Sequence, residues 1–212
     1  MVVYSIASRL YLALTNRANS VSLIESRGPG FIPPAGCVLT GLEPTAEQLV
    51  AAVELECAAN PSLRGDLCFA GAGEPLLRLG VLEQTASMLL KRQLASDIRV
   101  NTNGLQPSSS SAEVAARLRA AGVSSASVAL MTADAAEYQT LMKPEKLRLS
   151  PAVNLELGHS EVVSFVRACL AEGLAVECTA VASPGVDLEA TRALAEKLGA
   201  RFRARSWHAA TD

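Results

Sequence analysis

The chain lacks a membrane-length apolar run and lacks an excess of charge of either sign. None of its apolar runs reaches the roughly 18 residues that a membrane-spanning helix needs, so we expect a soluble, cytoplasmic protein with no membrane partner. Its 19 lysines and arginines are balanced by 21 aspartates and glutamates, for a formal net charge of -2. Such a chain offers no basic stripe, which disfavours nucleic acid as a partner.

A cysteine pattern for disulfides or for metal binding is also missing. The five cysteines are an odd number, and no two of them have the short spacing of metal ligands. A secreted disulfide scaffold is therefore not expected, and free cysteines are usually small buried hydrophobes. We expect that role for Cys37, Cys57, Cys68, Cys169 and Cys178.

The sequence does contain a regular alternation of strand-like and helix-like segments. Half of its 212 residues are apolar, enough for one well-buried domain, and we assign residues 1–212 to a single domain. Because parallel strands need crossover connections, the alternation predicts an α/β fold with a parallel sheet covered by helices. A complete eightfold barrel takes about 250 residues, so six strands favour a partial (β/α)6 TIM-like barrel over a doubly wound open sheet. The predicted strands cover residues 10–15, 66–70, 97–101, 125–131, 174–181 and 201–205.

Several helix ends can be placed from the sequence. Thr45 with Gln48, and Ser110 with Glu113, have the spacing at which a side chain and a backbone amide satisfy each other at a helix start. Residues 138–157 form the least regular segment, which is interrupted by two prolines and is expected to cover one end of the sheet. Further N-caps and glycine helix ends are expected at Ser160, Asp187, Gly122, Gly173 and Gly199.

Several segments resemble one enzyme family, and they occur in that family's order. They include LYLALTNR at the start of a long loop, LCFAGAGEPLL, RVNTNGL and SVALMTADAAEYQTLMKP. Together with the ending they lie at residues 10–36, 67–77, 99–105, 127–144 and 186–207. The chain resembles radical S-adenosylmethionine (radical SAM) proteins of the TatD-associated branch over nearly its whole length. The resemblance implies a partial barrel, a [4Fe–4S] cluster and S-adenosylmethionine as cofactors, and a functional link to a TatD-type nuclease.

The chain departs from that family at the cluster itself. In the family the LTNR motif runs into a Cys-x3-Cys-x2-Cys loop, and the matching positions here are Ala18, Ser22 and Glu25. Thiolates suit the iron of such clusters because they are soft donors. Alanine donates nothing, serine is a poor ligand at neutral pH and glutamate is a hard one. We therefore predict a degenerate site that holds no metal.

The polar turns after the second and third predicted strands are the candidate cofactor site. Carboxyl ends of parallel strands are where ligands bind, because their loops meet at one edge of the sheet. The resemblance implies that the GAGEP turn binds the amino group of S-adenosylmethionine. The amides of the NTNG turn are suited to binding ribose hydroxyls or a carboxylate. Their alternative role is ordinary turn chemistry. The candidate cofactor-binding residues are Gly71, Gly73, Glu74, Asn101, Thr102 and Asn103.

A second group of side chains could also face this edge. Thr132, Asp134 and Tyr138 follow the fourth predicted strand, although Asp134 is equally suited to capping a helix. Arg17 and Arg27 flank the degenerate loop and could hold an anion such as a carboxylate or a phosphate. Two solvated arginines beside a flexible loop are the alternative.

Three functions are compatible with this sequence. The first is a cluster-less radical SAM-fold protein that keeps a small-molecule pocket for S-adenosylmethionine or a nucleotide and has a binding or regulatory role. The second is an active radical enzyme with an unusual cluster site. The third is a non-radical enzyme that uses the polar mouth, for example with Glu74 as a general base. No catalytic residue can be assigned, and no substrate is identified.

Overall fold

A computed structural model describes residues 2–106, 109–150 and 153–210. Its main sheet has seven strands in the order β1-β2-β3-β4-β5-β8-β9. All neighbouring pairs are parallel except β1 with β2, which is antiparallel. The six predicted strands are therefore present, and β1 was not predicted. The bounds are β1 Val3–Ile6, β2 Arg9–Leu12, β3 Gly65–Phe69, β4 Ala95–Thr102, β5 Ser125–Ala129, β8 Ala175–Val181 and β9 Arg201–Arg205.

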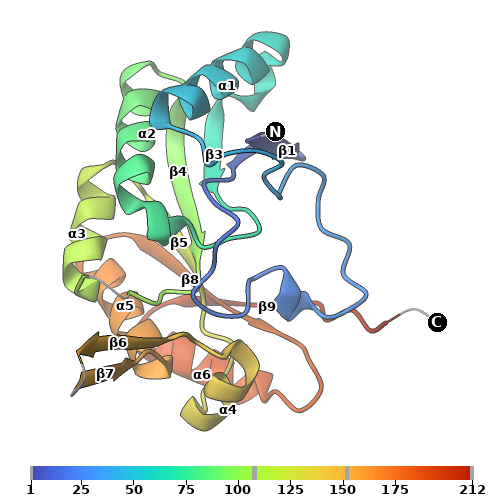
Figure 1. Ribbon diagram of the computed structural model, residues 1–212, viewed down its shortest axis with the longest axis vertical. Coiled ribbons are helices and arrows are strands. Elements are labelled where there is room, and N and C mark those ends of the chain that lie inside the picture. Colours follow the sequence, from blue (N-terminus) through green and yellow to red (C-terminus); the bar gives the residue numbers. More distant parts are fainter. Residues whose placement is uncertain (1, 107–108, 151–152, 211–212) are drawn as a thin grey trace.

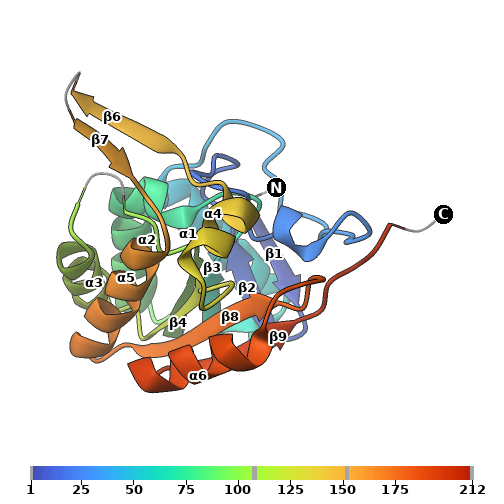
Figure 2. The same ribbon diagram turned by 90° about the horizontal axis from the view of Figure 1, so that it is seen from below.

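The helices gather on one face of this curved sheet, whereas the other face is covered by the long loop after β2 and by the chain's last described segment (Figures 1 and 2). Short 3-10 turns occur at Glu25–Arg27, Pro61–Leu63 and Pro75–Arg78. No helix in the described part of the chain is long and apolar enough to cross a membrane. The helices are α1 Ala46–Ala59, α2 Leu79–Lys91, α3 Ser111–Ala120, α4 Ala135–Met142, α5 His159–Ala171 and α6 Leu188–Leu198.

The two faces of the sheet have different side chains because successive residues of a strand point to opposite sides. On β3, Leu67 and Phe69 are buried in the apolar core that includes Leu49 of α1 and Leu82 of α2. Cys68, between them, lies on the opposite face and borders a cavity. All five cysteines are free and buried, as predicted.

Most of the predicted helix ends are confirmed. Thr45 and Gln48 form a reciprocal capping box, and Asp187 caps α6 by accepting from the backbone N–H of Ala190 at 2.9 Å. The prediction that Ser160 is an N-cap is wrong, because the N-cap of α5 lies two residues earlier, at Gly158. There the backbone N–H of Gly158 donates to the Glu161 carboxylate at 2.8 Å, so the acid three residues on fixes the helix start.

The segment expected to be irregular is more ordered than predicted. Besides α4 it contains an antiparallel hairpin of β6 Lys146–Ser150 and β7 Val153–Glu156, whereas residues 151–152 lie outside the described part. Figure 2 shows this hairpin projecting from the body of the protein. The hairpin therefore does not close one end of the sheet.

Candidate functional site

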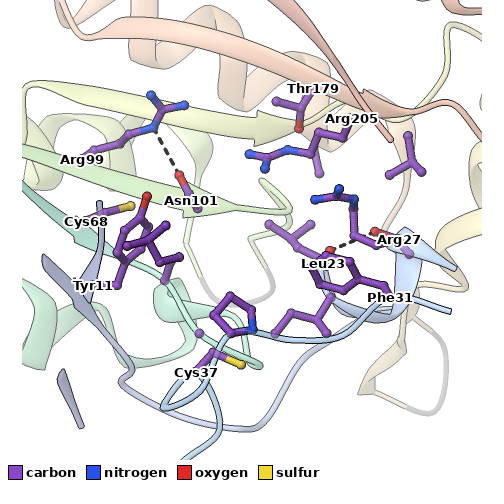
Figure 3. A pocket seen from close by; sticks show the side chains of 18 of the residues that line it. Tyr11, Leu23, Arg27, Phe31, Cys37, Cys68, Arg99, Asn101, Thr179 and Arg205 are labelled. Carbon is purple, nitrogen blue, oxygen red and sulfur yellow. Dashed lines mark hydrogen bonds between the residues drawn. The ribbon is translucent and has the colours of Figure 1, made fainter. Parts of the chain in front are cut away.

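A cavity of about 250 Å³ lies on the helix-free face of the sheet. Its walls come from all seven strands of the main sheet, from the turns after β3 and β5, and from the loop over residues 23–37. Figure 3 shows the side chains converging from the sheet and from this loop. The cavity therefore joins segments that are far apart in the sequence, as a ligand site on a partial barrel does.

Three of the predicted site residues, Gly71, Gly73 and Asn101, border this cavity. A Cβ atom at Gly73 would lie 2.4 Å from the carbonyl oxygen of Arg17, and one at Gly71 would lie 3.0 Å from that of Cys37. Both glycines thus allow the turn after β3 to approach the neighbouring loops closely. Asn101 is held from within its own strand, because Arg99 Nε donates to Asn101 Oδ1 at 3.2 Å.

The other three predicted site residues form a buried network behind the cavity wall. The Glu74 carboxylate, only 2% exposed, accepts from Thr102 Oγ1 at 2.7 Å, from the Asn103 backbone N–H at 2.8 Å and from the Leu76 backbone N–H at 3.0 Å. Asn103 Nδ2 in turn donates to Asn19 Oδ1 at 2.7 Å. Glu74 therefore ties the turns after β3 and β4 together and does not border the cavity as the general base of the third hypothesis would.

Burial also changes the acidity of this carboxyl group. Loss of solvent raises the pKa of Glu74 to about 7, and the hydrogen bonds from Asn103, Leu76 and Thr102 oppose part of that rise. The group is thus poised between its two charge states near neutral pH.

The residues after β5 have structural partners of their own. Thr132 is buried and donates a short hydrogen bond to the Glu137 carboxylate, and Asp134 caps α4 by accepting from the Glu137 backbone N–H at 2.7 Å. The Tyr138 ring is fully buried and packs at a tilt against His159. None of Thr132, Asp134 and Tyr138 borders the cavity beside β2–β4.

The loop after β2 is held in part by Ser22 and Glu25, two of the three residues at the predicted cluster positions. The Ser22 backbone N–H donates to Glu25 Oε2 at 2.9 Å, and the Glu25 backbone N–H donates to Ser22 Oγ at 3.2 Å. This reciprocal pair joins Ser22 to the first residue of the 3-10 turn Glu25–Arg27. Ala18 has no ligating atom, and within the described ranges no three histidine, cysteine or acidic side chains are arranged to hold a metal ion. These residues do not fit a [4Fe–4S] cluster.

The two arginines that flank the loop are separated by the structure. Arg17 points away, with an ion pair to Glu43 at 3.0 Å and a side chain that is 67% exposed. Arg27 borders the cavity, as do three arginines on strands β4 and β9. Sequence reasoning missed those three strand residues, although charged side chains at alternate positions of a strand already indicate a polar face. They are Arg99, Arg203 and Arg205.

The strand topology defines a partial TIM-like barrel of the kind found in radical SAM enzymes, as predicted. Similar solved structures include Streptococcus suis SuiB bound to precursor peptide SuiA, with a TM-score of 0.64 and 12% identity over 97% of this chain and 40% of SuiB. SuiB bound to S-adenosylmethionine gives a TM-score of 0.63 at 12% identity, over 95% of this chain and 39% of SuiB.

A third similar structure is that of TsrM from Kitasatospora setae, a radical S-adenosylmethionine methyltransferase with cobalamin and a [4Fe-4S] cluster bound. Its TM-score is 0.50 at 18% identity, over 76% of this chain and 31% of TsrM. No protein-family model and no curated protein matches the sequence. The chain spans about 40% of the length of SuiB, and at these identities the likeness shows the fold.

Proposed function

We propose that this chain is a radical SAM-fold protein of the TatD-associated type that has lost cluster chemistry and serves as a binding or regulatory protein. Its ligand would be S-adenosylmethionine or a related nucleoside-containing molecule in the cavity beside Gly71, Gly73 and Asn101. The observation that carries the proposal is the cavity itself, which borders the turn after β3 and the end of β4. Support also comes from SuiB, whose similar fold binds S-adenosylmethionine.

The first test measures whether the protein binds iron. We expect the purified protein, after anaerobic reconstitution, to hold no stoichiometric iron or sulfide, because Ala18, Ser22 and Glu25 supply no thiolate. Iron and sulfide analysis with a visible spectrum measures this directly. About four irons per chain with a broad absorption band would instead support the alternative, an active enzyme with an unusual cluster site.

The second test is binding of S-adenosylhomocysteine, measured by calorimetry. Without an iron to bind the amino and carboxylate groups, affinity must come from hydrogen bonds and apolar contact, which offset only part of the cost of association. We expect a dissociation constant between about 1 µM and 1 mM. Replacing Asn101 by alanine should weaken binding about three- to tenfold, because one neutral hydrogen bond is lost.

The matched control is Gln84→Ala, on the exposed surface of α2. It should leave the affinity unchanged. If the wild type shows no heat at millimolar ligand, or if Asn101→Ala and Gln84→Ala bind equally, the cavity is not a nucleoside site and this proposal is wrong.

A further inference from the structure

Two arginines from different segments reach into the cavity. Arg27 comes from the 3-10 turn Glu25–Arg27 and Arg205 is the last residue of β9, and Figure 3 shows both side chains on the same side of the cavity. Arg27 is fixed in place, because its Nε donates to the Ser206 carbonyl oxygen at 2.8 Å and its guanidinium lies 4.6 Å from the Phe31 ring centroid. Arg205 is anchored weakly, by a 3.5 Å contact to Ser127 Oγ.

The neighbouring arginines have carboxylate partners, and these two do not. Glu177 binds both Arg99, at 2.6 Å, and Arg203, at 2.8 Å. Among the residues that the structure describes, no carboxylate forms an ion pair with Arg27 or Arg205, and no aspartate or glutamate borders the cavity. Glu177 also attracts Arg205 from a greater distance, but it is one carboxylate shared by Arg99, Arg203 and Arg205, so this part of the cavity has an excess of positive charge.

That arrangement costs free energy unless an anion is present. Burial, together with the positive charges of Arg203 and Arg27, lowers the pKa of Arg205 to about 10, and the Glu177 carboxylate opposes part of that fall. Burial and Arg203 also lower the pKa of Arg27. A bound anion removes the repulsion and gains bidentate, charge-assisted hydrogen bonds, for which the planar guanidinium is well shaped.

The walls beside the two arginines are apolar. Leu23, Ile24 and Phe31 of the covering loop border the cavity here, and Figure 3 shows Leu23 and Phe31 near the Arg27 guanidinium. A bare inorganic ion would leave this apolar surface in water. A molecule that carries one anionic group on an apolar body would bury it, and burial of apolar surface is favourable.

We propose that Arg27 and Arg205 bind the carboxylate or phosphate group of a small organic molecule whose apolar part packs against Leu23 and Phe31. The proposal rests on the proposed function in taking this cavity as the ligand site. It adds a second ligand chemistry, an oxyanion, to the same cavity.

The test uses phenyl phosphate and benzoate as the two anionic probes and benzyl alcohol as the neutral one, with binding to the wild-type chain measured by calorimetry. We expect at least one anionic probe to bind, with an affinity that falls as salt is raised from 50 to 500 mM, about the range over which the Debye length shortens severalfold. The two anions separate a phosphate site from a carboxylate site. Benzyl alcohol should not bind detectably.

Variants then identify the residues. Arg205→Gln should weaken binding of the anionic probe by roughly tenfold or more, because a charge-assisted pair of hydrogen bonds is lost. The affinity of Arg205→Lys should lie between those of the wild type and Arg205→Gln, because lysine keeps the charge but not the two parallel donors of the guanidinium. Arg92→Gln is the matched control, on the far side of the sheet and paired with Glu54 at 2.6 Å. It should bind as the wild type does. Thermal melts check that each variant is folded.

The outcomes separate this inference from the proposed function. Equal affinity for benzyl alcohol and the anions, no anion binding by the wild type, or unchanged binding in folded Arg205→Gln overturns the oxyanion site. If the anions bind and S-adenosylhomocysteine does not, the proposed function is wrong and the oxyanion site stands. If S-adenosylhomocysteine binds and the anions do not, the oxyanion site is wrong and the proposed function stands.

Discussion

Replacing Glu74 by alanine is expected to lower the free energy of unfolding by about 3–5 kcal/mol. The carboxylate is buried and accepts hydrogen bonds from Thr102 Oγ1 and from the backbone N–H groups of Asn103 and Leu76. Truncation leaves these donors without an acceptor, and each buried unpaired donor costs about 1–3 kcal/mol. Chemical denaturation of the wild type and the variant measures the difference.

Two comparisons make this prediction specific. Glu74→Gln keeps the size of the side chain and one acceptor oxygen, so it should lose less stability than the alanine variant. Glu54→Ala removes an exposed ion pair to Arg92 and should cost less than about 1 kcal/mol. A loss at Glu74→Ala as small as that at Glu54→Ala would show that the network does not hold the two turns together.

The same carboxyl group makes stability depend on pH. Its pKa is raised from an ordinary value of 4.5 to about 7 in the folded protein, so the folded state holds its proton more tightly than the unfolded chain does. The resulting stabilisation is complete below pH 4.5 and is lost as pH rises toward 7, a change of about 3 kcal/mol. Unfolding measured at pH 4.5, 6 and 8 should show this fall in the wild type and not in Glu74→Gln. Parallel curves for the two proteins would contradict it.

The fold was largely predictable from the sequence because its signal is repeated. Five of the six parallel strands are followed by a helix, and an error in placing one helix end leaves the assignment of the other elements unchanged. Strand β1 was missed because it is only four residues long and is defined by its antiparallel pairing with β2, a tertiary contact. The α5 start was misplaced because Glu161, not Ser160, supplies the side-chain bond at that end.

The candidate site was predictable only in part. The turns after β3 and β4 do lie side by side, since parallel strands end at one edge, but the pattern did not indicate which side chains turn inward. Glu74 is directed into the protein by donors from Leu76, Thr102 and Asn103, two of which come from another strand end. The arginines of β9 were not predicted as cavity residues, because residues 201–205 were considered only as a strand and not for the face that their side chains occupy. Their alternation, with Arg203 and Arg205 two residues apart, already placed both on one face.

Replacing Gly73 by alanine is expected to destabilise the protein by about 3 kcal/mol and to weaken ligand binding in whatever fraction folds. The added Cβ would lie 2.4 Å from the Arg17 carbonyl oxygen and 2.5 Å from that of Thr15. Both are backbone atoms, so relief requires the loop after β2 to move away from the turn after β3. That movement opens the cavity wall at the place where Gly73 borders it.

The control for this substitution is Gly80→Ala, seven residues further along the chain. Gly80 is exposed in the first turn of α2 and has no heavy atom within 4 Å of the added Cβ, so alanine should stabilise the helix by up to about 1 kcal/mol. Thermal and denaturant unfolding of both variants, with S-adenosylhomocysteine calorimetry on the folded protein, distinguish the effects. If Gly73→Ala has the melting temperature of the wild type and binds ligand equally well, the turn after β3 and the loop after β2 can separate without cost. The cavity wall would then not depend on the glycine turn, and the GAGEP motif would have to be understood as a simple connection between β3 and α2.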